Sequence, residues 1–76
     1  MPTLDQLSAG NRARLSAIHG DGPLVQRFYE MGLLEGEEVE VIAFAPLGDP
    51  MEIRLRDYRL SLRRNEARLI EVEPLN

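Results

Sequence analysis

The sequence contains few side chains of the kinds that perform catalysis or bind metal ions. It has one histidine, His19, with Asp21 two residues later and another carboxylate, Asp49, in a separate loop. Iron(II) and zinc sites need three or more converging nitrogen, oxygen or sulfur ligands, and the chain has no cysteine. His19 and Asp21 are therefore candidate metal ligands without an evident third partner. A plain surface position at a strand end is the alternative interpretation of His19.

No catalytic arrangement is recognisable in the sequence. No serine lies in a nucleophile-elbow motif, and the carboxylates fall mostly at alternating positions, as on a solvated strand face. The GxxxxGK[ST] motif that cradles phosphates is absent, so this chain is not itself a P-loop GTPase. We therefore expect a binding module that needs no cofactor, rather than an enzyme.

The charged residues are unevenly distributed along the chain. All nine basic residues are arginines, and six of them fall between positions 54 and 68, whereas several glutamates gather between positions 30 and 40. The formal net charge of −4 argues against general binding of polyanions. Barrels that bind single-stranded nucleic acid also stack bases on exposed aromatic rings. The sequence patterns assign Phe28 and Tyr58 to the core, so we expect no nucleic-acid partner, although a nucleic-acid-binding barrel stays an alternative.

The size and composition indicate one small globular domain that spans residues 1–76. Hydrophobic residues make up 43% of the chain and charged residues 29%, which is typical of a folded protein. No apolar run is long enough to cross a bilayer, and no signal-peptide pattern begins the chain. We expect a cytoplasmic protein that does not insert into the membrane.

The local patterns predict mostly β-structure. Thr3 and Gln6 match a capping box that begins one helical turn, and residues 11–18 alternate as a half-buried strand. Pro23 suits the first position of a helix that Asp21 or Gly22 would cap. Further strands are predicted over residues 38–45, 51–56, 58–63 and 69–73, with a helical turn over 64–67. Ala43 and Tyr58 are expected to point inward. Five short strands with one inserted helix predict a small closed barrel.

The MGLLEG stretch, residues 31–36, joins the helix to the second strand. Gly32 occupies the position after the helix that favours a left-handed conformation, and Leu33 can then fold back onto Phe28. Leu34 to Glu37 are typical of a type II turn in which Gly36 takes the positive φ. One glycine therefore ends the helix, and the other directs the next strand.

In this order, the segments resemble the ferrous-iron-transport protein A (FeoA) family. The resemblance rests mainly on RFYEMGLLEG, VEVIAFAPLGDP and YRLSLRRNEA, and it covers nearly the whole chain. It implies an SH3-like β-barrel of the bacterial cytosol that assists FeoB, the membrane ferrous iron transporter, whose cytosolic G-protein region would be the partner. The family usually has Pro at position 35 and often Gly in the hairpin, where this chain has Glu35 and Asp57. Both turns stay feasible, because Gly36 carries the positive φ and Asp tolerates left-handed geometry.

Apolar residues on the loops, not all of which the core need use, are the candidates for partner binding. Leu33 and Leu34 follow the helix, and Leu47 lies between Pro46 and Gly48. Leucines on neighbouring loops would form a contact patch, although each could instead cap the core. Arg59, on the arginine-rich hairpin, is the next candidate. The expected function is docking on the transporter and modulation of it. A metal-responsive module that binds iron or zinc is an alternative.

Overall fold

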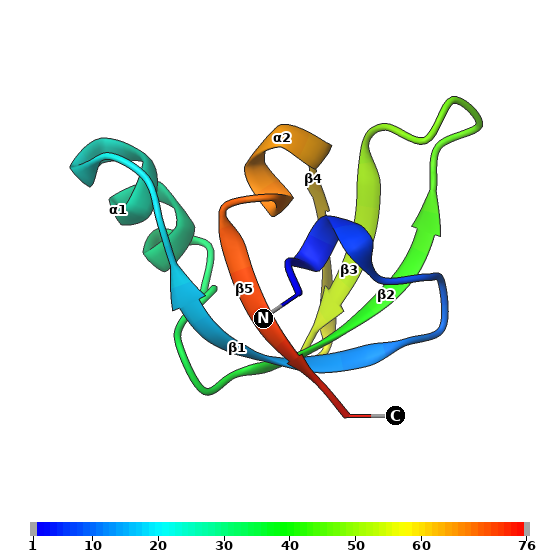
Figure 1. Ribbon diagram of the computed structural model, residues 1–76, viewed down its shortest axis with the longest axis horizontal. Helices are drawn as coiled ribbons and strands as arrows, with labels where there is room; N and C mark the ends of the chain where they lie inside the picture. Colours follow the sequence, from blue (N-terminus) through cyan, green and yellow to red (C-terminus); the bar gives the residue numbers. More distant parts are fainter. Residues whose placement is uncertain (1, 76) are drawn as a thin grey trace.

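Five antiparallel strands form one sheet in the computed structural model, which describes residues 2–75. In the order β4-β3-β2-β1-β5, the sheet curls around a single core (Figure 1). A 3-10 turn, η1, precedes the strands; α1 is inserted between β1 and β2, and α2 connects β4 to β5. The fold is the predicted mostly-β, SH3-like barrel with one inserted helix and an N-terminal helical turn. The elements are η1 (Leu4–Gln6), β1 (Arg12–Ile18), α1 (Gly22–Glu30), β2 (Glu38–Phe44), β3 (Met51–Leu55), β4 (Tyr58–Leu62), α2 (Arg64–Ala67) and β5 (Ile70–Pro74).

The strand pairing does not close the barrel, which corrects the closed arrangement expected from the sequence. β4 and β5 are the two ends of the described sheet and do not pair with each other. The N-terminal segment covers β5, because the Val72 N–H donates to the Pro2 carbonyl at 3.0 Å and Thr3 bridges to Glu71. The predicted domain, residues 1–76, includes Met1 and Asn76, which lie outside the described residues.

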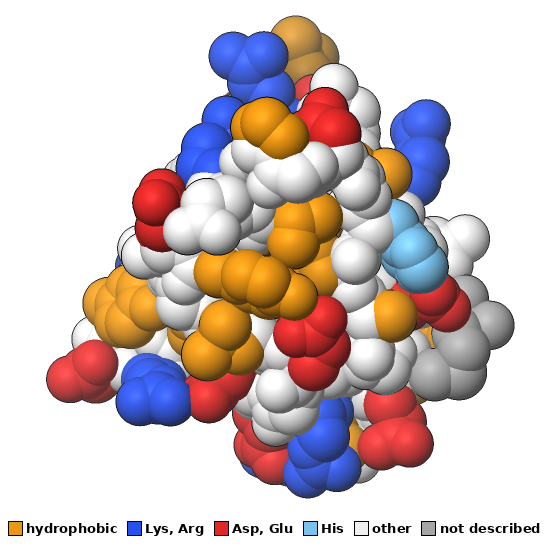
Figure 2. All heavy atoms as spheres, turned by 90° about the vertical axis from the view of Figure 1, so that its left-hand side faces the viewer, with side chains coloured by type: hydrophobic (Ala, Val, Ile, Leu, Met, Phe, Trp, Pro, Cys, Tyr) orange, Lys and Arg blue, Asp and Glu red, His pale blue; other side chains and the backbone are white. Residues whose placement is uncertain are grey.

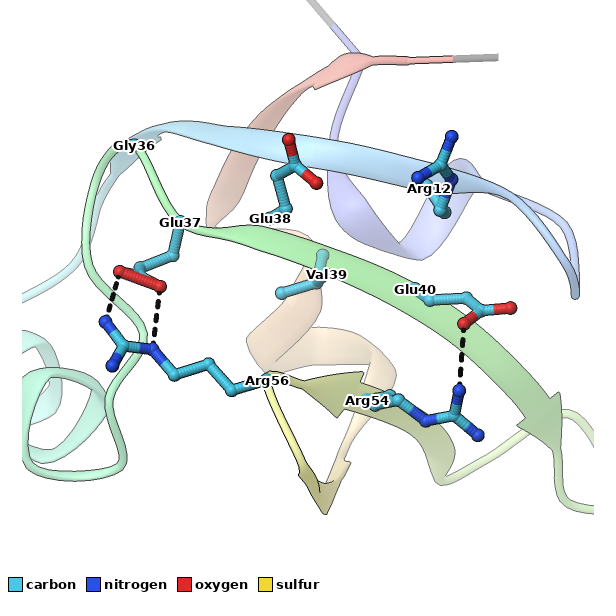
Figure 3. Close-up of a pocket in the computed structure, with 8 residues that line it drawn as sticks. All are labelled: Arg12, Gly36, Glu37, Glu38, Val39, Glu40, Arg54 and Arg56. Carbon is cyan, nitrogen blue, oxygen red and sulfur yellow. Dashed lines mark hydrogen bonds and ion pairs between the residues drawn. The ribbon is translucent and has the colours of Figure 1, made fainter.

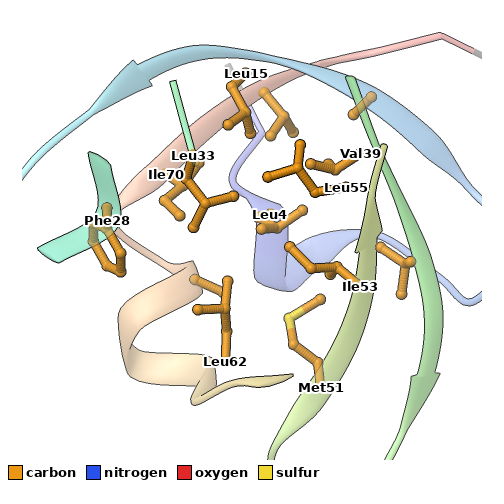
Figure 4. Close-up of a cluster of buried hydrophobic side chains, with 14 residues drawn as sticks. Leu4, Leu15, Phe28, Leu33, Val39, Met51, Ile53, Leu55, Leu62 and Ile70 are labelled. Carbon is orange, nitrogen blue, oxygen red and sulfur yellow. The ribbon is translucent and has the colours of Figure 1, made fainter. Parts of the chain in front are cut away.

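The core is formed by apolar side chains from all the strands and helical segments (Figure 4). Leu4 of η1, Phe28 of α1 and Ile70 of β5 are fully buried. Leu4 is brought inward by the predicted capping box, in which the Thr3 N–H donates to Gln6 Oε1 at 2.9 Å. Burial of these side chains is the main force that holds the elements together.

The strict alternation predicted for β2 fails near its end. The pairing with β3 shifts between Val41 and Ala43, because a bulge places Val41 opposite Ile53 but Ala43 opposite Glu52. Ala43 is therefore exposed, contrary to the prediction, while Val39 and Val41 are buried as expected. Tyr58 lies on the predicted inner face, directly opposite the buried Leu55, but at the start of β4 it is still 40% exposed.

The β3–β4 hairpin turns through two residues, Arg56 and Asp57. Only Arg56 adopts the left-handed region, with a φ of 59°, so Asp57 does not carry the positive φ suggested by the family pattern. A side chain in this region is less favourable than glycine. From this position the exposed Arg56 side chain forms an ion pair with Glu37.

The MGLLEG stretch adopts the predicted conformation. Gly32 and Gly36 have φ values of 90° and 94°. The Gly32 N–H donates to the Tyr29 carbonyl at 2.9 Å, and the Leu33 N–H donates to the Phe28 carbonyl at 3.0 Å. These two bonds define a Schellman motif, and they satisfy carbonyls at the end of α1. The Glu37 N–H then donates to the Leu34 carbonyl at 3.1 Å and closes the second turn.

Candidate functional site

Three exposed side chains gather around the C-terminal end of α1. Tyr29, Leu34 and Tyr58 are 37%, 43% and 40% exposed, and both tyrosines contact the segment that leads from Met31 to Glu35. We call Tyr29, Leu34 and Tyr58, with the half-buried Met31, the junction surface. Figure 2 shows apolar side chains gathered on the face that carries α1, with charged side chains around them. An exposed apolar surface with a charged rim is typical of protein-binding sites, and tyrosine is enriched at their centres.

Hydrogen bonds hold the two tyrosines of the junction surface in place. The Tyr58 hydroxyl donates to the Met31 carbonyl at 2.7 Å, and the Tyr29 hydroxyl donates to Glu35 Oε2 at 3.2 Å. The bond to the Glu35 carboxylate raises the pKa of Tyr29 above its usual value, and burial and the charge of Glu35 act in the same direction. Both rings are thus oriented before any partner arrives, which lowers the entropy cost of binding.

The helix that presents this surface has firmly defined ends. Asp21 caps its first turn by accepting a hydrogen bond from the Leu24 N–H at 2.8 Å, and Pro23 lies in that turn, as the sequence predicted. At the other end, Phe28 is fully buried against the core. The helix is therefore anchored at both ends, and the surface at its C-terminus has a rigid base.

The structure separates the three leucines that were candidates for one contact patch. Leu33 is fully buried, because the Schellman motif turns it back toward Phe28, so it is not available to a partner. Leu34 and Leu47 are exposed, but they lie beyond opposite ends of β2 (Figure 1). The seven residues of β2, at about 3.3 Å each, form a strand roughly 20 Å long between the two loops. The three leucines therefore do not form one patch: Leu33 caps the core, as the alternative interpretation had it, and only Leu34 belongs to the junction surface.

Leu47 occupies the tip of a well-supported loop between β2 and β3. Its side chain is 97% exposed, the largest value among the big apolar residues described. The base of the loop is fixed by Arg64, whose backbone N–H donates to Asp49 Oδ1 at 3.0 Å and whose guanidinium donates to the Gly48 carbonyl at 3.4 Å. The loop therefore presents one isolated leucine, far from the junction surface.

On the outer face of β2 and β3, arginine side chains are paired with glutamates. A shallow hollow on the outer side of β2 is lined by Glu37, Glu40, Arg54 and Arg56 among others (Figure 3). The Arg56 guanidinium donates two hydrogen bonds, of 3.1 and 2.7 Å, to the Glu37 carboxylate. These bonds lower the pKa of the Glu37 carboxyl below its usual value. Arg54 lies 3.4 Å from Glu40. This carboxylate pairing reduces the positive potential that a phosphate backbone would need.

Arg59 is the other candidate on this hairpin, and it is exposed on β4. Its guanidinium lies 3.9 Å from the Glu52 carboxylate, at the limit of an ion pair. It directly faces Arg54 across the β3–β4 ladder, so two like charges are adjacent there. Arg59 therefore retains capacity to bind an acidic group.

The candidate metal ligands do not converge in the described part of the chain. His19 lies at the end of β1 and pairs with Glu71, whereas Asp21 caps α1 and Asp49 binds the backbone of Arg64. Residues 2–75 contain no cluster of three or more histidine, cysteine or carboxylate side chains able to hold a metal ion. The described residues thus do not fit a structural zinc or iron site, which needs more converging ligands.

The fold defines a small SH3-like β-barrel domain with an exposed junction surface, and comparisons with known proteins identify its family. The family model described as the FeoA domain matches residues 3–74, so the chain belongs to the FeoA family. It is 41% identical over 70 residues to an Fe(2+) transport protein A/Fe(2+) transporter FeoB fusion protein from Porphyromonas gingivalis. That match covers 92% of this chain but only 8% of the length of the fusion protein.

Solved structures agree with this assignment. The FeoA protein from Chlorobium tepidum superposes with a TM-score of 0.92 at 37% identity, covering 99% of this chain and 71% of that one. FeoA from Stenotrophomonas maltophilia, described as a prokaryotic SH3 domain protein in complex with zinc, has a TM-score of 0.82 at 28% identity, with 96% and 91% covered. Both structures are of FeoA proteins, in agreement with membership of the FeoA family.

Sequence reasoning missed the two tyrosines of the junction surface. Tyr58 was assigned to the core by alternation, and Tyr29 was given no role. The place of Tyr58 beside the end of α1 depends on a long-range contact, the hydrogen bond to Met31, which joins residues 27 positions apart. The glycine at position 32 was the local sign that another side chain approaches closely there. In the structure, the Tyr58 hydroxyl lies where a side chain at position 32 would begin.

Proposed function

We propose that this chain is a small cytosolic accessory protein of bacterial ferrous iron uptake that docks on FeoB and modulates it without catalysing a reaction. The observation that carries the proposal is the Porphyromonas gingivalis relative, in which an FeoA domain and FeoB share one polypeptide. Domains joined in one chain are held at high effective concentration, which favours a functional contact between them. A separate chain would replace that linkage with a docking surface.

The junction surface is the proposed place of docking. It combines two tyrosines and a leucine, and its tyrosines are already oriented by hydrogen bonds. On the transporter side, the cytosolic G-protein region is the proposed partner. Docking can modulate FeoB only if the chain binds one of its conformations more tightly than another, for instance the guanine-nucleotide-bound conformation. No helix within residues 2–75 is both long and apolar enough to span a bilayer, which is compatible with a cytosolic docking protein.

The test is binding of the purified chain to detergent-solubilised FeoB from the same bacterium, measured with GDP, with a non-hydrolysable GTP analogue and without nucleotide. We expect saturable binding whose affinity differs between nucleotide states, and the isolated G-protein region should reproduce it. Absence of binding in every state would overturn the proposal. If the chain binds FeoB equally tightly in all nucleotide states, docking is supported but nucleotide-dependent modulation is not. A ligand that binds two conformations with equal affinity does not shift the equilibrium between them.

A further inference from the structure

The outer edge of β4 is free in the described part of the structure. β4 ends the sheet order and pairs with β3 alone. The two-residue hairpin closes on Leu55 and Tyr58, so alternate residues of β4 direct their backbone groups toward β3. Arg59 and Ser61 fall between those residues, and their N–H and C=O groups therefore point outward. An open row of this kind is a template for another strand.

A hollow of about 520 Å³ lies beside the end of this edge. Ser61, Leu62 and Arg63 line it from β4 and the residue that follows, and Arg27 lines it from α1. Met31, just after that helix, Pro50 and Glu66 complete the lining, and the Glu66 carboxylate is paired with Arg27. Leu62 is buried and Met31 half-buried, so the hollow has an apolar floor between polar walls. Met31 also belongs to the junction surface, which makes the hollow a continuation of that surface.

The charges beside this edge favour an acidic occupant. Arg59 has its nearest carboxylate, on Glu52, at 3.9 Å. The Arg63 side chain forms no ion pair within residues 2–75, although its backbone N–H donates to Glu66 at 3.1 Å. A second copy of the chain is a poor occupant, because pairing two β4 edges would bring their Arg59 and Arg63 side chains together, and like charges on adjacent strands repel.

We propose that the free edge of β4 accepts an extended, acidic segment of FeoB as a sixth strand. The inference rests on the proposed function, which supplies the partner. Backbone hydrogen bonds to Arg59 and Ser61 would provide affinity, and an acidic side chain of the segment would pair with Arg59 or Arg63. Strand addition at this edge would place the rest of FeoB next to the junction surface.

A proline substitution at position 61 tests the backbone contact directly. Ser61→Pro removes one outward N–H, which β3 does not use, so the domain should still fold. Ser61→Ala keeps that N–H and is the matched control. Against solubilised full-length FeoB, we expect Ser61→Pro to bind at least about tenfold more weakly, while Ser61→Ala binds like the unaltered chain. Arg63→Glu should also weaken binding, and the loss should be greatest at low salt.

Amide hydrogen exchange of the unaltered chain provides a second measurement, which does not depend on how well a variant folds. Addition of FeoB should slow exchange at the Ser61 and Arg59 amides, as expected when edge N–H groups enter a ladder. Unchanged exchange at these amides in the FeoB complex would overturn the inference while leaving the proposed function intact. So would a folded Ser61→Pro variant that binds normally. No binding of the unaltered chain would overturn both, and protection that rises with chain concentration alone would assign the edge to a second copy.

Discussion

The Tyr58 hydroxyl donates a 2.7 Å hydrogen bond to the Met31 carbonyl and lies where a side chain at position 32 would begin. This contact ties the start of β4 to the end of α1. It also explains Gly32 in two ways. Residue 32 must adopt a φ of 90°, and it must leave room for the tyrosine. Gly36 has a similar φ of 94°, but a Cβ there would meet no atom within 4 Å.

The two glycines should therefore respond differently to substitution. Gly36→Ala carries only the cost of a left-handed alanine, roughly 1 kcal/mol. Gly32→Ala adds the collision with Tyr58, so we expect it to destabilise the domain by about 2 kcal/mol or more. Thermal and urea unfolding of both variants measure the difference.

The Tyr58→Phe background separates the collision from the backbone cost. Tyr58→Phe alone should cost about 1 kcal/mol through loss of its hydrogen bond. In this background, Gly32→Ala should cost less than it does in the unaltered chain, because the hydroxyl is gone. Equal costs of Gly32→Ala in the two backgrounds, or equal effects of Gly32→Ala and Gly36→Ala, would contradict the collision.

The Glu37–Arg56 pair predicts a pH-dependent contribution to stability. Hydrogen bonds from Arg56 hold the pKa of Glu37 below its ordinary value of 4.5, with the Arg56 charge acting in the same direction and burial opposing them. A carboxyl whose folded pKa is lowered stabilises the fold above its unfolded pKa. That contribution is lost as the pH falls through the folded pKa.

Glu37→Gln should therefore lower the melting temperature near neutral pH. The difference in melting temperature between Glu37→Gln and the unaltered chain should become smaller as the pH falls below 4.5. The measurement is a series of thermal melts across that range, with Glu30→Gln as the control for a general loss of negative charge. A gap that stays constant with pH would show that the ionised form of Glu37 does not contribute.

Local sequence patterns were sufficient where neighbouring residues determine the conformation. The Asp21 cap, the left-handed Gly32 and the turn at Gly36 each depend on residues within one helical turn or one β-turn. The strand positions followed from alternation for the same reason. Alternation failed at Ala43, because a bulge depends on the partner strand and leaves no mark in the sequence of its own strand.

The candidate site was less predictable because it is assembled from distant segments. Local pattern distinguished Leu33 from Leu34, since the Schellman motif buries the first and exposes the second. It could not show that Tyr58 reaches the end of α1, because sheet order and curvature determine that contact. The open edge of β4 likewise follows from topology.

Arg64 should be more important to the fold than its charge suggests. Its guanidinium donates to the Asp5 carbonyl at 3.0 Å and to the Gly48 carbonyl at 3.4 Å, and it lies 5.1 Å from the centre of the Phe44 ring. Lysine cannot make this forked set of contacts. We expect Arg64→Lys to destabilise the domain by about 1–2 kcal/mol, measured by urea unfolding. Arg68→Lys is the control and should have little effect, since Arg68 is exposed and 3.9 Å from Asp5.

Arg59 tests the nucleic-acid alternative. Its ion pair with Glu52 is long and exposed, so Arg59→Ala should change the free energy of unfolding by less than about 1 kcal/mol. Binding of the unaltered chain to a random single-stranded oligonucleotide should be weak, and the substitution should change it little. A large, salt-dependent loss of oligonucleotide affinity in Arg59→Ala would instead favour a nucleic-acid-binding function.

Leu34 and Leu47 form a matched pair for locating the docking surface. Both are exposed leucines in loops, so Leu34→Asp and Leu47→Asp should each leave the fold nearly intact, as circular dichroism melting would show. Only Leu34 belongs to the junction surface with Tyr29 and Tyr58. We expect Leu34→Asp to weaken binding to FeoB by tenfold or more, because docking would bury an unpaired carboxylate.

Leu47→Asp should bind FeoB with unchanged affinity, since the two leucines lie beyond opposite ends of β2, a strand roughly 20 Å long. The reverse result, with Leu47→Asp impaired and Leu34→Asp normal, would move the contact to the β2–β3 loop. Impairment of both would require an interface that extends along β2, larger than the junction surface. Normal binding of FeoB by both variants would show that neither apolar loop belongs to the interface. The interface would then be centred on the β4 edge, with Arg59 and Arg63.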